Sequence, residues 1–354
     1  MFETIQRGSR LAGRLLQANV GRLAYPLKLN WSLTYWCQYR CKTCNIWQRR
    51  PVDELTTDEV LTFVHRNPAV SWLDVTGGEI FLRKDITDIF DAIVDTWQDL
   101  FILHFPTNGF QTRQIVDAAE RLARSRVPHL VVTVSVDGNE ALNDDVRGIK
   151  GGFRHQMETF NALRAIPRIR AVIGMTLSRF NAGRVEETFD AVRTECPGLG
   201  AGDFHVNFAQ VSDHYYGNAG DDIAAPRDVA VRELKTYRSR RALDRSAPGW
   251  VEDRFLSGLE RYLQSGRTPM PCHSLRSSCF IDPWGVVFPC ITYTHPLGRL
   301  RDTAMQLAPI WDDDRTATTQ REIWEGRCPQ CWTACEAYHS ILGNLARPFR
   351  ANAL

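Results

Sequence analysis

Three closely spaced cysteines constrain this chain more than any other feature. The segment Trp36-Cys37-Gln-Tyr-Arg-Cys41-Lys-Thr-Cys44 spaces its thiols as C-x3-C-x2-C, so one tight loop presents all three. A four-iron cluster needs four ligands, and three thiolates leave one iron open for a substrate or cofactor. A structural zinc site normally needs a fourth protein ligand, and no further His or Cys lies near this segment. The spacing therefore favours an iron–sulfur cluster.

Six more cysteines lie near the other end of the chain: Cys272, Cys279, Cys290, Cys328, Cys331 and Cys335. The tenth, Cys196, lies in neither group. In a reducing compartment, thiols at short spacing are more often metal ligands than disulfides. Cys290 follows a Pro-Trp-Gly turn signal and ends a predicted hairpin, and a later C-x2-C precedes a predicted helix at Glu336–Leu345. Thiolates from both parts can close around one centre, and zinc is the alternative metal.

Composition excludes several classes of protein. The 354 residues carry 43 Lys and Arg against 41 Asp and Glu, a net charge of +2. Binding through phosphate neutralisation needs a concentrated basic excess, so a nucleic-acid partner is disfavoured. No apolar run of about 18 residues exists, which excludes a transmembrane helix. The N-terminus lacks a signal-peptide core, so we expect a cytoplasmic protein.

Short β-branched runs alternate with amphipathic stretches through the first two thirds of the chain. Apolar strands separated by segments of 3.6-residue period favour a parallel sheet with helices on its outer face. Six units are too few for an eight-stranded barrel, so we predict an α/β fold, an open (β/α)6 partial TIM barrel with a small C-terminal hairpin-plus-helix module. The predicted strands are Leu29–Thr34, Trp72–Thr76, Phe101–Pro106, Leu130–Val136, Ala171–Leu177 and Phe204–Gln210, and the predicted helices are Thr57–Arg66, Ile86–Trp97, Arg113–Ser125, Phe153–Ile166 and Arg184–Glu195.

This pattern divides the chain into four predicted regions: an amphipathic helix in 1–28, the core in 29–212, a connecting helical region in 213–270 with helices at Val229–Leu243 and Phe255–Gln264, and the C-terminal module in 271–354. The N-terminal helix carries four arginines among its leucines. We expect it to pack against the barrel floor, and the alternative is a peripheral contact with a membrane surface.

Polar and glycine-rich motifs follow the first four predicted strands. They are the cysteine loop after the first strand, Gly77-Gly78-Glu79 after the second, Thr107-Asn108-Gly109 after the third, and Ser135 to Gly138 at the end of the fourth. Open α/β sheets bind ligands at the carboxyl ends of their strands. The sequence therefore predicts that the site lies at this rim.

C-x3-C-x2-C after the first strand and GGE after the second resemble the radical S-adenosylmethionine superfamily over roughly residues 29 to 210. The resemblance implies that Cys37, Cys41 and Cys44 hold a [4Fe–4S] cluster whose open iron chelates S-adenosylmethionine. One electron, from a flavodoxin- or ferredoxin-type donor, would then release a 5′-deoxyadenosyl radical that abstracts hydrogen from the substrate.

The same resemblance implies further contacts. Gly77, Gly78 and Glu79 match the motif that holds the methionine amino group, which a carboxylate suits. Asn108 belongs to the cofactor-binding set, Ser135 and Asp137 look like a pair near the ribose or methionine, and Arg147 resembles an arginine that meets the methionine carboxylate. Most members have an aromatic residue just before the third cysteine. This chain has Thr43 there, so adenine contacts are expected from Ile46 or Trp47.

The C-terminal cysteines resemble the Twitch and SPASM auxiliary-cluster modules, because Cys272, Gly285 and Cys290 follow the form C-x12-G-x4-C. The C-x2-C-x3-C that follows is shorter than the full SPASM pattern. We therefore expect one auxiliary [4Fe–4S] cluster, held by Cys272, Cys290, Cys328 and Cys331, with Cys279 or Cys335 as substitutes.

An auxiliary cluster favours a net two-electron oxidation, because it can accept the electron left after hydrogen abstraction. We expect a small-molecule substrate such as a sugar or amino-sugar, since only about 30 residues precede the first strand. The alternatives are maturation of a ribosomal peptide, modification of a lipid, and a non-catalytic metal-stabilised binding protein. Candidate pocket residues follow the sixth strand: we expect only one of His205 and Asn207 to face inward, and the others are Gln210, His214 and Tyr215.

Overall fold

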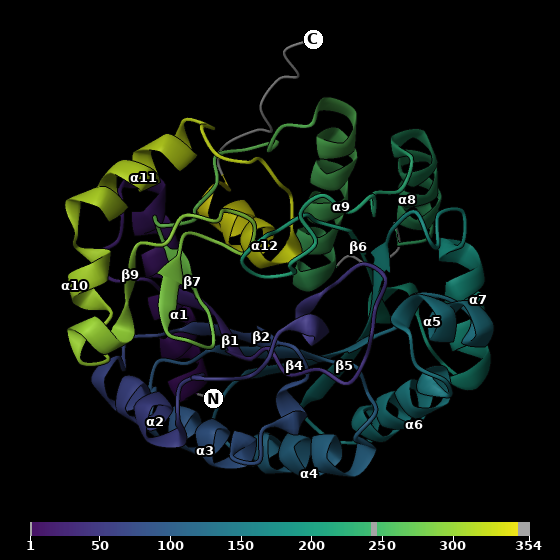
Figure 1. Cartoon of the computed structure of the whole chain (residues 1–354), viewed down its shortest axis with the longest axis horizontal. Helices are drawn as coiled ribbons and strands as arrows, with labels where there is room; N and C mark the ends of the chain where they lie inside the picture. The colour runs from purple at the N-terminus through teal and green to yellow at the C-terminus, as the bar shows by residue number, and fades with distance from the viewer. Residues whose placement is uncertain (1, 242–245, 346–354) are drawn as a thin grey trace.

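The computed structural model describes residues 2–241 and 246–345. Nine strands form one sheet in the order β6-β5-β4-β3-β2-β1-β7-β8-β9. The first six are mutually parallel, and the curved sheet opens toward the top of Figure 1. This confirms the predicted open partial barrel. The six strands are β1 (Lys28–Thr34), β2 (Trp72–Gly77), β3 (Ile102–Thr107), β4 (His129–Ser135), β5 (Ile169–Leu177) and β6 (Phe204–Phe208).

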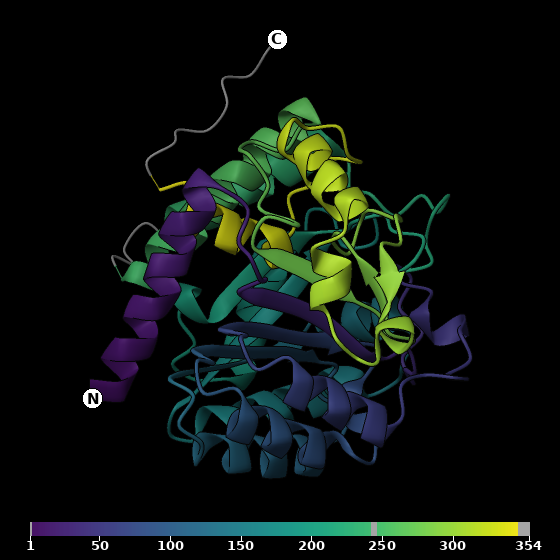
Figure 2. The same ribbon diagram turned by 90° about the vertical axis from the view of Figure 1, so that its left-hand side faces the viewer.

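A row of helices covers the convex face of the sheet, below the strands in Figure 2. They are α2 (Thr57–Arg66), α3 (Ile86–Thr96), α4 (Thr112–Ala123), α6 (Gly152–Arg164) and α7 (Val185–Glu195). Alternate strand residues such as Leu103 and Phe105 are buried against them. A helix that the sequence analysis missed, α5 (Glu140–Arg147), begins where the side chain of Asn139 accepts a hydrogen bond from the Leu142 N–H at 3.0 Å.

The concave face of the sheet is polar rather than aliphatic. The buried Lys28 amine lies 2.7 Å from the Asp74 carboxylate, which lies 3.3 Å from the His104 ring. His104 in turn hydrogen-bonds the Thr133 hydroxyl at 2.9 Å. Closed barrels of this class fill their interior with Val, Ile and Leu. The open barrel instead presents hydrogen-bonding groups toward its interior.

The C-terminal strands extend the same sheet. β7 (Ser278–Ile281) pairs in parallel with β1 and antiparallel with β8 (Val286–Phe288), which pairs with β9 (Gly298–Arg299). The Asp282 carboxylate accepts hydrogen bonds from the N–H groups of Trp284 and Val286 at 3.0 and 2.8 Å, and Gly285 takes a φ of +77°. The predicted hairpin is therefore present.

Helix α12 (Ala334–Gly343) lies within the concavity of the sheet, between β7 and β6 in Figure 1. Its Glu336 accepts a hydrogen bond from Asn30 of β1 at 2.8 Å. Its Tyr338 donates to Glu252 of α9 (Ala247–Ser265) at 2.6 Å and lies 3.2 Å from the His205 ring of β6. The remaining helical segments are α8 (Arg227–Arg241), α9 (Ala247–Ser265), α10 (Ala308–Trp311), α11 (Asp314–Trp324) and the 3-10 turns η1 (Ile46–Gln48), η2 (Ile80–Leu82), η3 (Ala201–Asp203) and η4 (Leu300–Thr303).

The N-terminal helix α1 (Phe2–Val20) packs on the amino-terminal end of the sheet. Leu11, Leu15 and Ala18 are buried in a cluster with Leu27 and Trp72. Two of its arginines donate to the protein itself, Arg7 to the Arg126 carbonyl and Arg14 to the Ala69 carbonyl, each at 2.8 Å. The helix therefore packs against the floor of the barrel, as the sequence predicted.

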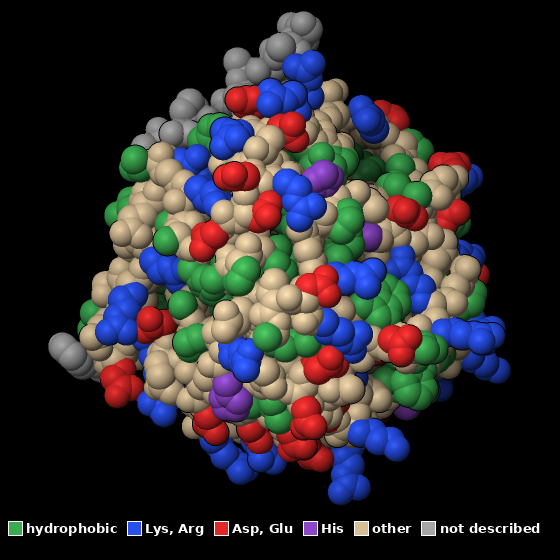
Figure 3. Space-filling model, turned by 60° about the vertical axis from the view of Figure 1, so that its left-hand side comes forward, with side chains coloured by type: hydrophobic (Ala, Val, Ile, Leu, Met, Phe, Trp, Pro, Cys, Tyr) green, Lys and Arg blue, Asp and Glu red, His purple; other side chains and the backbone are tan. Residues whose placement is uncertain are grey.

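The predicted division into four regions stays a prediction, and part of the predicted helix Val229–Leu243 lies outside the described residues. No helix in the described part of the chain is long and apolar enough to cross a membrane. Basic and acidic side chains are interspersed over the face shown in Figure 3, in keeping with the near-neutral net charge.

Candidate active site

The loop after β1 carries Cys37, Cys41 and Cys44 at the carboxyl end of the sheet, all as free thiols. Burial, followed by repulsion from the Cys41 thiolate, raises the pKa of Cys37 and of Cys44 to about 12. Burial also raises the pKa of Cys41, which the Arg147 guanidinium opposes. The three sulfurs therefore lie within electrostatic reach of one another, and a bound cation would stabilise their thiolate forms.

The turn after β2 holds one side of the cysteine loop. The N–H groups of Gly78 and Glu79 donate to the carbonyls of Thr34 and Trp36 at 2.7 and 2.8 Å. A Cβ at Gly77 would lie 2.2 Å from the Thr34 carbonyl oxygen, and one at Gly78 would lie 2.2 Å from the Trp36 oxygen. Both glycines are needed because the two backbones touch.

The end of α5 holds the second side of the loop. The N–H of Arg40 donates to the Arg147 carbonyl at 3.2 Å, and that of Lys42 donates to the Val146 carbonyl at 2.9 Å. Gly148 ends the helix with a φ of +63°, and a Cβ there would lie 2.4 Å from the Arg40 carbonyl oxygen.

The segment after β6 holds the third side. The Asn45 N–H donates to the Tyr216 carbonyl at 2.8 Å. The side-chain amide of Asn218, which is fully buried, donates to the carbonyls of Thr43 and Gln210 at 2.9 and 3.0 Å. Nothing local in the sequence marks Asn218, because its partner Thr43 lies far along the chain.

Glu79 is buried beside the cysteine loop. Its carboxylate accepts hydrogen bonds from the Asn108 N–H at 2.7 Å and from the Thr107 hydroxyl at 3.0 and 3.1 Å. The side chain of Asn108 donates to Gln38 at 3.1 Å. Burial outweighs these hydrogen bonds and raises the pKa of Glu79 to about 7. A cationic ligand group would restore the ionised carboxylate.

Asp137 and Arg147, predicted as separate cofactor contacts, bind each other. Their side chains lie 2.7 Å apart, and Asp137 also accepts from the Thr176 N–H at 2.8 Å. The guanidinium lies over the Tyr39 ring at 5.3 Å. Both the Arg147 Nε and the Tyr39 hydroxyl are buried without a hydrogen-bond partner in residues 2–241 and 246–345. Such unsatisfied donors fit a site that receives a polar group, while Ser135 lies beside them at the end of β4.

Three C-terminal thiols, those of Cys272, Cys290 and Cys328, gather around a fourth, that of Cys331. After burial, repulsion from Cys331 is among the causes that raise the pKa values of Cys272 and Cys290, and Cys328 acts likewise on Cys331. Hydrogen bonds join Cys290 Sγ to the Thr292 hydroxyl at 3.3 Å and Cys328 Sγ to the Gln330 amide at 3.4 Å. Among the described residues, no three His, Cys, Asp or Glu side chains form a group that could hold a single metal ion.

The two substitute ligands, Cys279 and Cys335, pack in two different hydrophobic clusters. Cys279 belongs to β7 and packs in the main hydrophobic core, because it alternates with Ser278 and Phe280, which face the concave side. Cys335 packs in a separate cluster near Tyr215, but repulsion from Cys331 is also among the causes that raise the pKa of Cys335. The ligand set remains a prediction, and burial in the main core disfavours Cys279.

An aromatic cluster packs against cysteines from both parts of the chain. Tyr215 and Tyr216 have ring centroids 4.5 Å apart, and Cys37, Cys44 and Cys335 pack against the same cluster. The Tyr215 hydroxyl lies 2.5 Å from that of Thr76. Its other members are Tyr35, Ile46, Phe280, Phe288 and Ile291. The cluster therefore joins the cysteine loop to the C-terminal segment that carries Cys335.

The predicted pocket residues do not form one pocket but lie in different surroundings. His205 and Asn207 occupy the same face of β6, because residues two apart on a strand point the same way, so the prediction that only one faces inward was wrong. His205 lies 2.8 Å from Glu252. His214 stacks on Phe288 with centroids 4.2 Å apart, Tyr215 joins the aromatic cluster, and Gln210 lines a cavity.

Two family models match the chain. The model of the radical SAM superfamily matches residues 31–192, and that of an iron–sulfur cluster-binding domain, SPASM, matches residues 272–336. The first range contains the cysteine loop, the glycine turn and Arg147, and the second contains the thiols around Cys331. The predicted cofactors, S-adenosylmethionine and iron–sulfur clusters, agree with these two matches.

Three curated relatives are similar to this chain at 24% to 29% identity. The sporulation killing factor maturation protein SkfB of Bacillus subtilis is 24% identical over 79% of this chain and 64% of SkfB. The subtilosin biosynthesis protein AlbA of the same species is 24% identical over 82% and 61%. The mycofactocin maturase MftC of Mycobacterium ulcerans is 29% identical over 49% and 46%. The aligned region thus spans less than two thirds of each relative.

Solved structures share the fold. SuiB of Streptococcus suis, bound to S-adenosylmethionine, superposes with a TM-score of 0.60 at 16% identity, covering 90% of this chain and 73% of SuiB. The anSMEcpe structure with bound AdoMet and Kp18Cys peptide gives 0.58 at 14% identity, covering 84% of both chains.

Proposed function

The chain belongs to the radical SAM superfamily and carries a SPASM iron–sulfur domain, and from this premise we propose that it is a maturase that oxidises a peptide. The relatives SkfB and MftC are named as a maturation protein and a maturase, and AlbA is named as a biosynthesis protein of the bacteriocin subtilosin. They do not support the small-molecule substrate expected from the sequence, and they favour the peptide alternative.

One observation carries the proposal: the aromatic cluster around Tyr215 and Tyr216 lies within electrostatic reach of thiols from both groups. After burial, the causes that raise the pKa of Tyr216 include repulsion from Cys44 of the first group and from Cys331 of the second. A substrate held at the edge of this cluster is within reach of both groups. That arrangement suits a reaction that removes hydrogen at one centre and an electron at another.

The first three thiols, Cys37, Cys41 and Cys44, would hold a [4Fe–4S] cluster. When bound, S-adenosylmethionine and the two clusters supply a carbon radical that removes one hydrogen atom and an acceptor for the remaining electron. The backbone hydrogen bonds that hold the cysteine loop on its three sides would fix the position of this first cluster.

Glu79 and Arg147 would orient the methionine part of the cofactor. Glu79 faces an ammonium with a buried carboxylate, whose position the Asn108 N–H fixes at 2.7 Å. Arg147 has a buried Nε left over after Asp137 has taken its Nη1, and that donor suits a carboxylate. Asp137 then acts by positioning Arg147 rather than by contacting the cofactor.

The thiols around Cys331 would hold the second cluster. The Thr292 hydroxyl, 3.3 Å from Cys290 Sγ, and the Gln330 amide, 3.4 Å from Cys328 Sγ, donate toward the ligands, which stabilises thiolate charge. A flavodoxin- or ferredoxin-type protein would supply the electron that starts each turnover.

The experiment compares two substrate pools. The anaerobically reconstituted protein is incubated with S-adenosylmethionine, dithionite and either a mixture of peptides or a mixture of amino-sugars. We expect the peptides to stimulate 5′-deoxyadenosine formation and one of them to lose two hydrogens by mass. Stimulation by the amino-sugars alone would refute the proposal. Cys290→Ala is the matched variant, and we expect it to cleave S-adenosylmethionine without forming product.

A further inference from the structure

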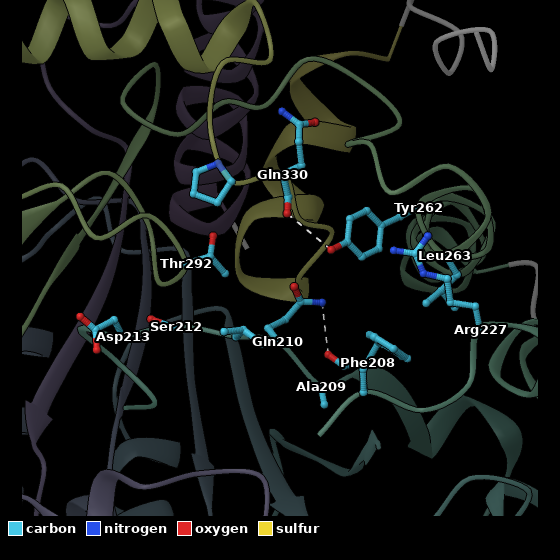
Figure 4. A pocket seen from close by; sticks show the side chains of 13 residues that line it. Phe208, Ala209, Gln210, Ser212, Asp213, Arg227, Tyr262, Leu263, Thr292 and Gln330 are labelled. Atoms are coloured by element: carbon cyan, nitrogen blue, oxygen red, sulfur yellow. Dashed lines mark hydrogen bonds between the residues drawn. The ribbon is translucent and has the colours of Figure 1, made fainter. Parts of the chain in front are cut away.

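A cavity of about 380 Å³ lies beside the thiols around Cys331, between the end of β6 and the last turn of α9. Figure 4 shows side chains from separate segments of the chain converging on it. Its volume lies within the range of small-molecule sites, about 300 to 1,000 Å³. We call it the β6 cavity.

The walls of the β6 cavity are mainly apolar. Phe208 and Leu263 are 7% and 2% exposed, and Ala209, Pro329 and the ring of Tyr262 complete this surface. The Tyr262 hydroxyl is turned toward the Gln330 carbonyl at 3.4 Å (Figure 4). An apolar or aromatic side chain of a ligand would displace water from these walls.

Gln210 presents an acceptor at the centre of the cavity. Its side chain is 8% exposed, and its Nε2 donates to the Phe208 carbonyl at 3.3 Å. No described group donates to its Oε1, which points into the cavity in Figure 4. A backbone N–H of a bound peptide would donate to this oxygen, which lines the cavity.

Charged side chains of opposite sign flank the cavity. Arg227 and Asp213 lie on opposite sides of Gln210 in Figure 4, and neither forms an ion pair with another residue in the described ranges. A ligand that continues past the apolar walls therefore meets a free guanidinium at one end, which suits a carboxylate.

The β6 cavity is linked to both thiol groups. Thr292 and Gln330 line it and hydrogen-bond the Cys290 and Cys328 sulfurs. On the opposite wall, the Gln210 carbonyl shares the buried amide of Asn218 with Thr43 of the cysteine loop. An occupant therefore contacts residues that bond the Cys290 and Cys328 sulfurs directly and one, Gln210, that is linked to the cysteine loop through Asn218.

We propose that the β6 cavity recognises the peptide substrate by one apolar or aromatic residue with an acidic residue beside it. The apolar side chain packs between Phe208 and Leu263, its backbone N–H donates to Gln210, and the acidic side chain meets Arg227. This proposal rests on the peptide-oxidising function proposed above and adds the sequence preference of the substrate.

Calorimetry on the anaerobically reconstituted protein tests this preference. The probes are the blocked tetrapeptides acetyl-Ala-Phe-Asp-Ala-amide, its Phe-to-Ala analogue and its Asp-to-Lys analogue. We expect the first to bind most tightly. Losing the phenyl ring should weaken binding about tenfold, because a buried aromatic side chain contributes about 1.5–3 kcal/mol, part of which ordering the peptide offsets.

Two variants and a control assign the contacts. Arg227→Gln should weaken the Phe-Asp probe about two- to fivefold and leave the Asp-to-Lys analogue unweakened, as an exposed ion pair predicts. Gln210→Ala should weaken all three probes about three- to tenfold by removing a shared backbone contact. Arg232→Gln is the control, since Arg232 is an exposed residue of α8 paired with Asp228.

Equal affinity for the three probes, or an Arg227→Gln effect matched by Arg232→Gln, would overturn the inference. 5′-Deoxyadenosine formation without substrate is measured on every variant. If wild-type protein forms it and binds no probe preferentially, only the cavity assignment fails. If wild-type protein does not form it, the proposed function fails first.

Discussion

Replacing Gly78 by Ala tests whether the turn after β2 is fastened to the cysteine loop as described. The new methyl carbon would lie 2.2 Å from the Trp36 carbonyl oxygen, 2.6 Å from its carbon and 3.1 Å from the Cys37 Cβ. Two of these three neighbours are backbone atoms, so no side chain can rotate away. The loop and the turn must therefore move apart.

The cost follows from the contacts that are lost. Separation breaks the hydrogen bonds donated by the Gly78 and Glu79 N–H groups, at about 0.5–1.5 kcal/mol each. Forcing a methyl group into a closed contact adds about 1–3 kcal/mol. The total, about 2–6 kcal/mol, is a large part of the 5–15 kcal/mol that stabilises a typical native protein.

The assay is calorimetric melting together with iron analysis after anaerobic reconstitution. We expect the melting temperature to fall by several degrees and iron to be lost from the first cluster only, because the residues around Cys331 do not contact Gly78. Gly13→Ala is the matched control, since no atom lies within 4 Å of a Cβ there. In the middle of α1 it should stabilise by about 0.5–1 kcal/mol. A Gly78→Ala protein with the wild-type melting temperature and full iron would refute the reasoning.

Three further predictions concern the ligands and Glu79. Cys37→Ala should remove about four of about eight irons and abolish 5′-deoxyadenosine formation, and retained cleavage would contradict the assignment. Because burial raises the pKa of Glu79 to about 7 and an ammonium favours the ionised carboxylate, affinity for S-adenosylmethionine should rise as pH increases through about 7, with release of a proton on binding. Calorimetry in two buffers of different ionisation enthalpy measures that proton, and Glu79→Gln should abolish its release. Cys279→Ala should keep the iron of the second cluster and Cys290→Ala should lose it, and equal losses would place Cys279 among the ligands.

Local patterns were enough to predict most of the fold. Thr57–Arg66 was predicted to its exact ends, because the Thr56 capping box marks its start. α5 was missed because it has only eight residues, three of them acidic, so its apolar pair Leu142 and Val146 gives a short signal. The polar concave face was missed too. Asp74 and His104 are single interruptions in apolar runs, and only the register between β2 and β3 places them together.

The site was predictable where the signal lies in one segment. The spacing of Cys37, Cys41 and Cys44 needed no tertiary information. The pairing of Asp137 with Arg147 and the role of Asn218 could not be predicted, because each contact joins elements that only the fold brings together.

Helix α12 has a consequence for biosynthesis. The ribosome delivers this helix last among the described elements, yet its Glu336 bonds β1, and its Tyr338 meets α9 and the His205 ring of β6. Until α12 folds, the polar concave face of the sheet stays uncovered, and Lys28 lacks its hydrogen bond to the Cys335 carbonyl. Closure of the barrel and arrival of the final thiols are therefore a single late event. Iron delivered to the second site before α12 has folded would find an incomplete set of ligands, so assembly of that centre should begin only after α12 is in place.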